Sequence, residues 1–187
     1  MSGIAGMAET MDSEKRGTLI VLTGDGKGKT TSAVGCMLRA LGQGMRVCMI
    51  QFLKGPWRSG ELDALRSFGD RAEVHAMGLG FTWDSPARRD EHVAAAKEAW
   101  AFAERLLSAP GFDVLVLDEL TYLVKHGILS DSEVLNAIRG RPAGMHVVVT
   151  GRDASSTLIE AADIATEMKQ LRHQFDSGAA SIRGIEF

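Results

Sequence analysis

The sequence lacks the features that anchor a protein in a membrane or export it. Its 187 residues contain no apolar run near the ~20 residues that cross a bilayer, and the N-terminus has no apolar core of the signal-peptide kind. The two cysteines, Cys36 and Cys48, fall in a predicted helix and a predicted strand and are expected to be buried, reduced thiols. We therefore expect a cytoplasmic protein with no membrane partner.

A strong charge bias and a metal-binding cluster are also missing. Lysine and arginine total 21 against 24 aspartates and glutamates, and the net charge of −3 indicates no overall basic footprint for nucleic acid. The five histidines are scattered and form no zinc-binding spacing with the cysteines. Apolar residues, in contrast, make up 45% of the chain, which suits one domain with a sizeable core. We expect a globular protein that does not bind nucleic acid.

Two regions of the chain differ in composition. Residues 1–16 are small, polar and aperiodic, which predicts a flexible N-terminal tail; an arm that orders over a ligand or a neighbouring subunit is the alternative. Over residues 17–187, strand and helix signals alternate, and the predicted strands are apolar throughout, as in a parallel sheet covered on both faces. The prediction is one α/β domain of three layers, with a mostly parallel sheet between helices. Strands are expected at 18–22, 47–52, 72–77, 114–117, 146–150 and 164–168, and helices at 29–41, near 62–68, from 86 towards 109, at 130–139 and at 154–162.

The most informative segment is a glycine-rich loop, residues 23–31, between a buried strand and an amphipathic helix. Its glycines allow positive φ and leave no Cβ in the way, so backbone N–H groups can approach phosphates at a helix N-terminus. Lys29 can reach terminal phosphate oxygens, and Thr30 can offer its hydroxyl to a bound magnesium ion. The loop predicts a P-loop NTPase-like (RecA-like) fold that binds a nucleoside triphosphate. We assign nucleotide binding to Thr23, Gly24, Asp25, Gly26, Lys27, Gly28, Lys29, Thr30 and Thr31.

This loop departs from the pattern G-x-x-x-x-G-K-[ST] at one position. Counting back from Gly28, Thr23 stands where the pattern has its first glycine, and Gly24 comes one place late. The shape of the loop is therefore expected to differ from the usual one. A glycine-rich turn with chance lysines is the alternative, but strand, loop and helix follow in the order that a phosphate site needs.

Two further elements are expected at the same edge of the sheet. The strand at 114–117 ends in Asp118 and Glu119, the Walker B position, so we assign Thr30, Asp118 and Glu119 to Mg²⁺ or Mn²⁺. An acidic strand end that caps the next helix is the alternative. Arg152 follows the strand at 146–150 and is assigned to the phosphates, against the alternative of a simple strand-to-helix turn.

Phe81 and Trp83 are large aromatic residues in a glycine-containing loop. Their chemistry favours either a small satellite hydrophobic cluster or a wall for a flat apolar ligand. The residues alone favour the hydrophobic cluster.

Taken together, these stretches resemble the phosphate-loop class of ATP:corrinoid adenosyltransferases, which act on cob(I)alamin or cob(I)yrinic acid a,c-diamide. The resemblance covers nearly everything after residue 17. Its discriminating stretches are Gly-Phe-Thr-Trp at 80–83 and Thr-Gly-Arg at 150–152, because many ATPases share the loop and the acidic strand end. The other matching stretches are residues 23–31, 47–55, 117–120, 141–142, 146–149, 162–168 and the C-terminal Gly-Ile-Glu-Phe.

The resemblance implies that cobalt(I) of a corrinoid attacks C5′ of ATP and that inorganic triphosphate departs, in adenosylcobalamin biosynthesis or salvage. It implies catalytic roles for Lys29, which stabilises charge on the triphosphate, for Glu119, which holds metal or orders water, and for Phe81 and Trp83, which occupy the lower face of the corrinoid. It also implies Mg²⁺ or Mn²⁺ with ATP, an electron-donating flavin or flavoprotein reductase, and a homodimer. Two alternatives remain: a phosphate-loop ATPase or kinase with another acceptor, and a non-catalytic ATP- or corrinoid-binding module.

Overall fold

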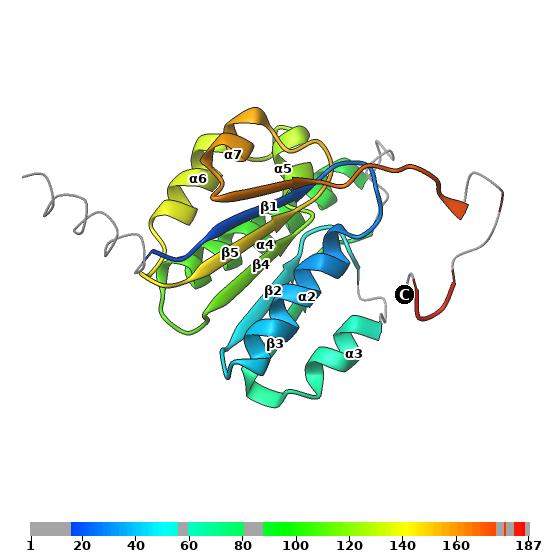
Figure 1. The fold of residues 1–187 in the computed structure, drawn as a ribbon. Helices are drawn as coiled ribbons and strands as arrows, with labels where there is room; N and C mark the ends of the chain where they lie inside the picture. The colour runs from blue at the N-terminus through cyan, green and yellow to red at the C-terminus, as the bar shows by residue number, and fades with distance from the viewer. Residues whose placement is uncertain (1–15, 56–59, 81–87, 175–177, 179–181, 186–187) are drawn as a thin grey trace, which may run out of the picture.

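The computed structural model describes residues 16–55, 60–80, 88–174, 178 and 182–185. Within these residues six strands form one sheet in the order β3-β2-β4-β5-β1-β6, and every neighbouring pair is parallel (Figure 1). The strands are β1 (Leu19–Thr23), β2 (Val47–Gln51), β3 (Ala72–Ala76), β4 (Val114–Asp118), β5 (His146–Thr150) and β6 (Ile164–Glu167).

Helices cover both faces of this sheet, because alternate strand residues point to opposite sides. Met49 and Val116 pack with α2 and α3, whereas Cys48 and Leu115 pack with the helices of the other face. The three-layer α/β fold predicted from the sequence is therefore confirmed. The first face carries α2 (Lys29–Gly42) and α3 (Gly60–Arg66); the second carries α4 (Arg89–Ser108), α5 (Thr121–Lys125), α6 (Asp131–Arg139) and α7 (Ser156–Ala161), and a 3₁₀ turn, η1 (Gly69–Arg71), precedes β3.

The helix boundaries follow local chemistry where the sequence supplies it. Ser130 caps α6 through a complete capping box: its backbone N–H donates to Glu133 Oε2 at 2.7 Å, and the Glu133 N–H donates to Ser130 Oγ at 3.2 Å. The short α5, directly after β4, was not predicted, because five residues are too few to show a helical period. The predicted start of the long helix at Pro86 lies outside the described residues, and α4 is described from Arg89.

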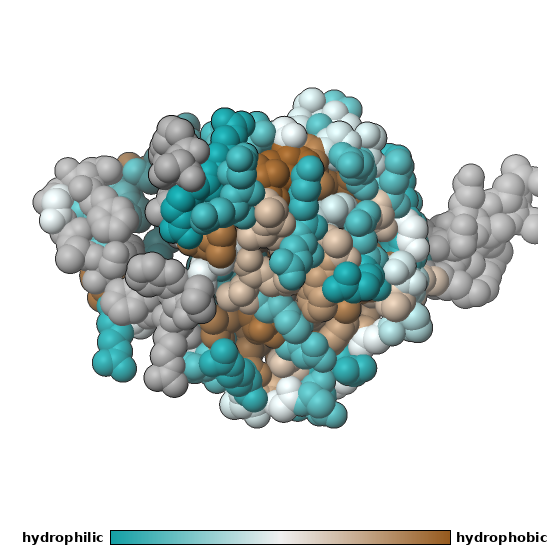
Figure 2. Space-filling model, turned by 180° about the vertical axis from the view of Figure 1, so that it is seen from behind, coloured by the Kyte–Doolittle hydropathy of each residue, from teal (hydrophilic) through white to brown (hydrophobic). Residues whose placement is uncertain are grey.

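The direction of the strands determines where a site can form, and the helices and the surface have further general properties. All six strands run the same way, so their carboxyl ends, and the loops that follow them, lie along one edge of the sheet. In the described part of the chain, none of the helices combines the length and apolar character needed to span a membrane. On the face seen in Figure 2, hydrophilic residues lie scattered among apolar ones.

Candidate functional site

The glycine-rich loop after β1 is packed against the chain that leaves β6. Gly26 N–H donates to Met168 O at 2.6 Å, and Met168 N–H donates to Thr23 O at 2.8 Å. A Cβ on Gly24 would lie 2.4 Å from Met168 O, and one on Gly26 would lie 2.7 Å from it. Gly24 also has φ of 95°. These glycines are thus required by the neighbouring backbone as well as by close approach to a phosphate.

Thr23, the departure from the usual loop pattern, has a structural partner. Its side chain is buried, and its hydroxyl accepts a hydrogen bond from Ala154 N–H at 3.1 Å. Glycine at this position has no side-chain oxygen that could accept this bond. Thr23 therefore ties the phosphate loop to the segment that follows β5.

The helix α2 starts directly from the loop without a side-chain cap. Its N-cap residue is Gly28, with φ of 120°, and no side-chain hydrogen bond from the described residues caps this helix start. Such a helix end favours an anion, because the unpaired N–H groups and the helix dipole both carry partial positive charge. The loop and the helix end therefore form a phosphate-binding geometry.

Lys29 folds back over the loop. Its Nζ donates to Gly24 O at 2.6 Å and to Gly26 O at 2.8 Å, so the described residues engage two of its three N–H groups. Burial, followed by the positive charge of Arg152, lowers the pKa of Lys29. Arg152 Nε also lies 3.9 Å from Asp25 Oδ1 in an exposed ion pair. The structure thus brings Arg152, Asp25 and Lys29 to one edge, as the sequence predicts.

Asp118 is the hub of the site and is fully buried. Its Oδ1 accepts from Thr30 Oγ1 at 2.9 Å and from Thr150 Oγ1 at 2.7 Å, and its Oδ2 accepts from Gln51 Nε2 at 3.2 Å. The carboxylate therefore joins the ends of β2, β4 and β5 to the start of α2. The structure brings Thr30 and Asp118 together, whereas Gln51 and Thr150 were not among the predicted site residues.

Glu119 differs from Asp118 in its backbone conformation and its hydrogen bonding. Its backbone is in the left-handed region, with φ of 66°, and its N–H donates to Thr150 Oγ1 at 2.9 Å. Its Oε2 is buried and has no hydrogen-bond partner among the described residues. Burial, then the neighbouring charge of Asp118, raises the pKa of Glu119 to about 7. A strained backbone and a perturbed carboxyl group together are typical of a functional position.

These residues fit a hydrated Mg²⁺ or Mn²⁺ ion. Thr30, Asp118 and Glu119 offer oxygen ligands, which such hard cations prefer. Among the described residues, the buried side-chain atoms without a hydrogen-bond partner are Gln51 Oε1 and Glu119 Oε2. Both are acceptors, and water bound to a cation is a donor. The described residues contain no group of three or more His, Cys, Asp or Glu that could hold an ion by themselves. Phosphate oxygens of a nucleotide and water are therefore needed to complete the coordination.

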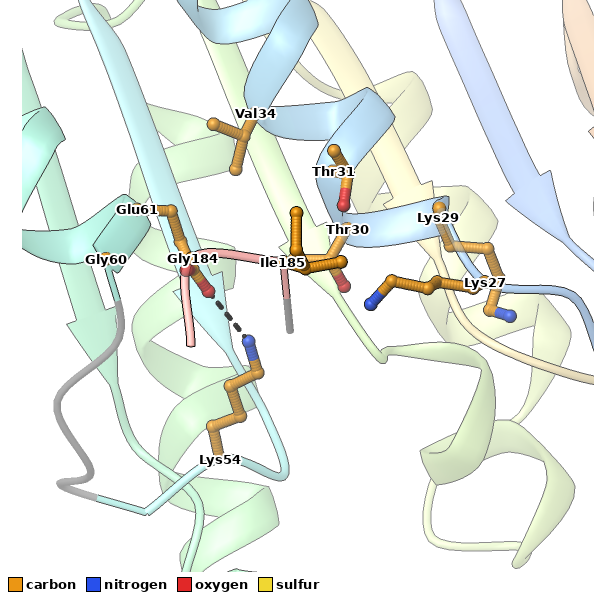
Figure 3. Close-up of a pocket in the computed structure, with 11 residues that line it drawn as sticks. Lys27, Lys29, Thr30, Thr31, Val34, Lys54, Gly60, Glu61, Gly184 and Ile185 are labelled. Carbon is orange, nitrogen blue, oxygen red and sulfur yellow. Dashed lines mark hydrogen bonds and ion pairs between the residues drawn. The ribbon is translucent and has the colours of Figure 1, made fainter. Parts of the chain in front are cut away.

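A cleft of about 410 Å³ opens beside the loop (Figure 3). Lysines and threonines of the phosphate loop form one side, and residues that follow β2 form the other; Gly184 and Ile185 approach from the C-terminal segment. Lys54 and Glu61 form an ion pair, with Nζ 3.0 Å from Oε1, and neither was among the site residues predicted from the sequence. Their position after the carboxyl end of β2 is the signal that could have found them. The lining consists of Lys27, Gly28, Lys29, Thr30, Thr31, Val34, Lys54, Gly60, Glu61, Gly184 and Ile185.

Of the two discriminating stretches, the structure describes Thr-Gly-Arg at 150–152 in full but only the first residue of Gly-Phe-Thr-Trp at 80–83. Gly151 has φ of 138°, and a Cβ there would lie 2.0 Å from Thr121 Oγ1, which itself donates to Arg152 O at 2.6 Å. Glycine is therefore needed for Thr-Gly-Arg to turn towards the loop. Phe81 and Trp83 lie outside the described residues. The residue before them, Gly80, donates from its N–H to Leu53 O at 2.9 Å, next to Lys54 in the chain.

The chain is similar to known proteins of one family over most of its length. Residues 15–187 match the model of the family described as ATP:corrinoid adenosyltransferase BtuR/CobO/CobP. The chain is 46% identical over 174 residues to a corrinoid adenosyltransferase of Pseudomonas aeruginosa, covering 93% of this chain and 85% of the relative. It is 41% identical to the corrinoid adenosyltransferase of Escherichia coli strain K12 and 40% identical to corrinoid adenosyltransferase CobA of Salmonella typhimurium, covering 93% of this chain and 87% of each relative.

Among solved structures, the chain is similar to the flagellar accessory protein FlaH from Methanocaldococcus jannaschii. The TM-score is 0.51 at 11% sequence identity, covering 82% of this chain and 71% of that one. At this identity the likeness concerns the fold alone.

Proposed function

Because the chain belongs to the ATP:corrinoid adenosyltransferase family, and is thus a transferase whose substrates are ATP and a corrinoid, we propose that it transfers the 5′-deoxyadenosyl group of ATP to cobalt(I) and releases inorganic triphosphate. The observation that carries this proposal is the phosphate loop joined through Thr30 to buried Asp118 beside the cleft. This reaction belongs to adenosylcobalamin biosynthesis or salvage.

The reaction makes few chemical demands on the protein. The bond between cobalt and C5′ forms as the bond between C5′ and the triphosphate oxygen breaks, and the bonding electrons leave with the triphosphate. No proton moves in this step, so no general base is needed. The protein must align C5′ with cobalt and stabilise the charge that builds on the leaving triphosphate.

The chain's own residues suit this division of labour. The loop N–H groups and the uncapped start of α2 bind the phosphates, and Lys29, already held by two loop carbonyls, directs its third N–H to a phosphate oxygen. Thr30, Asp118 and Glu119 would hold Mg²⁺ or Mn²⁺, which when bound neutralises part of the triphosphate charge. A nearby cation favours the ionised form of Glu119, whose pKa of about 7 otherwise leaves it partly protonated at neutral pH.

We further propose a role for two aromatic residues at the corrinoid, a source of electrons for cobalt, and an oligomeric state. Phe81 and Trp83 would occupy the lower face of the corrinoid, which removes the lower ligand and eases reduction of cobalt(II). A flavin or flavoprotein reductase would deliver the electron, and the enzyme would act as a homodimer. The family resemblance of the stretch at 80–83 and the anchoring of Gly80 beside the cleft support the first of these.

Product analysis tests the function. Wild-type protein, MgATP and chemically reduced cobalamin should yield adenosylcobalamin, seen in its optical spectrum, and one inorganic triphosphate for each product molecule. Release of ADP and phosphate without a corrinoid would instead assign a hydrolase or kinase. A Lys29→Ala variant should lose most of the adenosylation; full activity in this variant would remove the loop from the reaction and favour a non-catalytic binding module.

A further inference from the structure

A cationic side chain stands on the side of the cleft opposite the phosphate loop. Lys54 follows β2, and its Nζ lies 3.0 Å from Oε1 of Glu61 in the first turn of α3. The two side chains are only 29% and 23% exposed. In Figure 3 they lie across the cleft from Lys27 and Lys29, with Ile185 between the two groups. A ligand that fills this cleft contacts both walls.

The charge around Lys54 keeps it protonated. Burial by itself lowers the pKa of Lys54, but the negative charges of Asp118, Glu61 and Glu119 outweigh burial, so that its pKa lies above the ordinary value. Asp118 and Glu119 are also the carboxylates assigned to the metal. A metal cation bound at Asp118 and Glu119 would neutralise the attraction of these two carboxylates for Lys54. The hydrogen bond to Glu61 uses only one of the three N–H groups of Lys54, so the other two can point to a ligand in the cleft.

We propose that Lys54 is a further cationic ligand for the triphosphate, placed on the wall opposite the phosphate loop, and that Glu61 is the residue that positions it. A phosphate chain gripped by the loop at one end meets Lys54 with its other oxygens. In the reaction, Lys54 stabilises charge on the departing triphosphate, a role that rests on the proposed function. Its affinity for the triphosphate does not depend on that function.

The competing explanation is an ion pair that only ties the end of β2 to α3. A structural pair of this kind affects the free energy of unfolding but not the affinity for triphosphate at a given fold. The neutral variant Lys54→Met keeps the aliphatic stem and loses the charge, whereas Lys54→Arg keeps the charge. Arg66→Gln is the matched control, because Arg66 lies at the end of α3, is exposed, pairs with Asp63 at 3.1 Å, and does not line the cleft.

Calorimetric titration with inorganic triphosphate and Mg²⁺, without corrinoid, measures the proposed contact directly. We expect Lys54→Met to bind at least about tenfold more weakly than wild type, the lower end for a hydrogen bond to a charged group. Lys54→Arg should retain most of the affinity, and Arg66→Gln should match wild type. Equal affinity in wild type and Lys54→Met, or an equal loss in Arg66→Gln, would overturn the proposal.

A second measurement needs no variant and therefore no assumption about folding. Amine acetylation followed by mass spectrometry reports the accessibility of each lysine in wild-type protein. Inorganic triphosphate with Mg²⁺ should slow acetylation of Lys54 several-fold and leave exposed Lys97 on α4 unchanged. Unchanged acetylation of Lys54 at saturating triphosphate would refute the contact.

These binding experiments separate the two proposals. If wild-type protein forms no adenosylcorrinoid but binds triphosphate through Lys54, the proposed reaction fails and the site remains. If adenosylation proceeds and Lys54→Met has wild-type affinity and wild-type kcat/KM for ATP, the reaction stands and the role of Lys54 fails.

Discussion

Replacing Glu119 by glutamine should make the stability of this protein less dependent on pH. The pKa of Glu119 is raised from 4.5 to about 7 in the folded protein, first by burial and then by Asp118. The folded state therefore binds more protons than the unfolded state between these two pH values, and the free energy of unfolding must fall as the pH rises through this range. The ionised carboxylate destabilises the fold, and glutamine cannot ionise.

The magnitude follows from the two pKa values. At 1.36 kcal/mol per pH unit, the difference between 4.5 and about 7 corresponds to about 3 kcal/mol. Below pH 4.5 the carboxyl is protonated in both states, so the two proteins should have similar stability. Above pH 7 the Glu119→Gln variant should be more stable than wild type by about 2–3 kcal/mol.

Urea denaturation followed by circular dichroism at several pH values from 4.5 to 8.5, without metal or nucleotide, is the assay. The stability of Glu119→Gln relative to wild type should grow from pH 4.5 to about pH 7 and then level off. Glu104→Gln, which changes an exposed glutamate on α4, should show no such trend. A difference that stays constant within about 0.5 kcal/mol across the range would refute a buried, perturbed Glu119. The same variant should bind Mn²⁺ with nucleotide more weakly, because it loses an anionic ligand.

Four further substitutions test other features of the structure. Thr23→Val should lower the free energy of unfolding by about 1 kcal/mol, because Ala154 N–H loses its acceptor; denaturation with no loss would assign Thr23 no anchoring role. Gly24→Ala should destabilise by more than about 2 kcal/mol and abolish ATP binding, since its Cβ would lie 2.4 Å from Met168 O at positive φ. Gly35 lies in the interior of α2, where an added Cβ would meet no neighbouring atom within 4 Å, so Gly35→Ala should instead stabilise the protein by about 0.5–1 kcal/mol. Calorimetric melting of both glycine variants checks the contrast. Gln51→Met should weaken Mn²⁺ binding and cost about 1–3 kcal/mol, because Asp118 Oδ2 loses a buried donor; wild-type metal affinity, measured by electron paramagnetic resonance, would contradict the fit of Gln51 to the ion's hydration shell.

Local chemistry explains why much of the fold could be predicted. Continuous apolar runs mark strands that are buried on both faces, and the pair Ser130 and Glu133 marks the start of α6, because capping acts over three residues. The phosphate loop is likewise a contiguous segment whose glycines and Lys29 reveal its chemistry without knowledge of the fold. Short α5 escaped prediction because its helical conformation depends on packing rather than on a visible period.

The site was only partly predictable, because its other members are far apart in the chain. Gln51 and Thr150 meet Asp118 from neighbouring strands, over separations of 67 and 32 residues. The sequence could not separate the roles of Asp118 and Glu119. The structure distinguishes Asp118, with both carboxylate oxygens hydrogen-bonded, from Glu119, which has a strained backbone and a buried oxygen without a partner in the described part of the chain.

The sequence by itself determined the layered α/β fold, the phosphate loop and the acidic end of β4, since each depends on the order of residues within a short segment. Only the tertiary structure decided why the loop begins with Thr23, which accepts a hydrogen bond from the segment after β5. It also decided the second wall of the cleft, where Lys54 and Glu61 come together across α3 and the end of β2. Parallel strands bring their carboxyl ends to one edge, so residues that are distant in the chain share a site that no local pattern records.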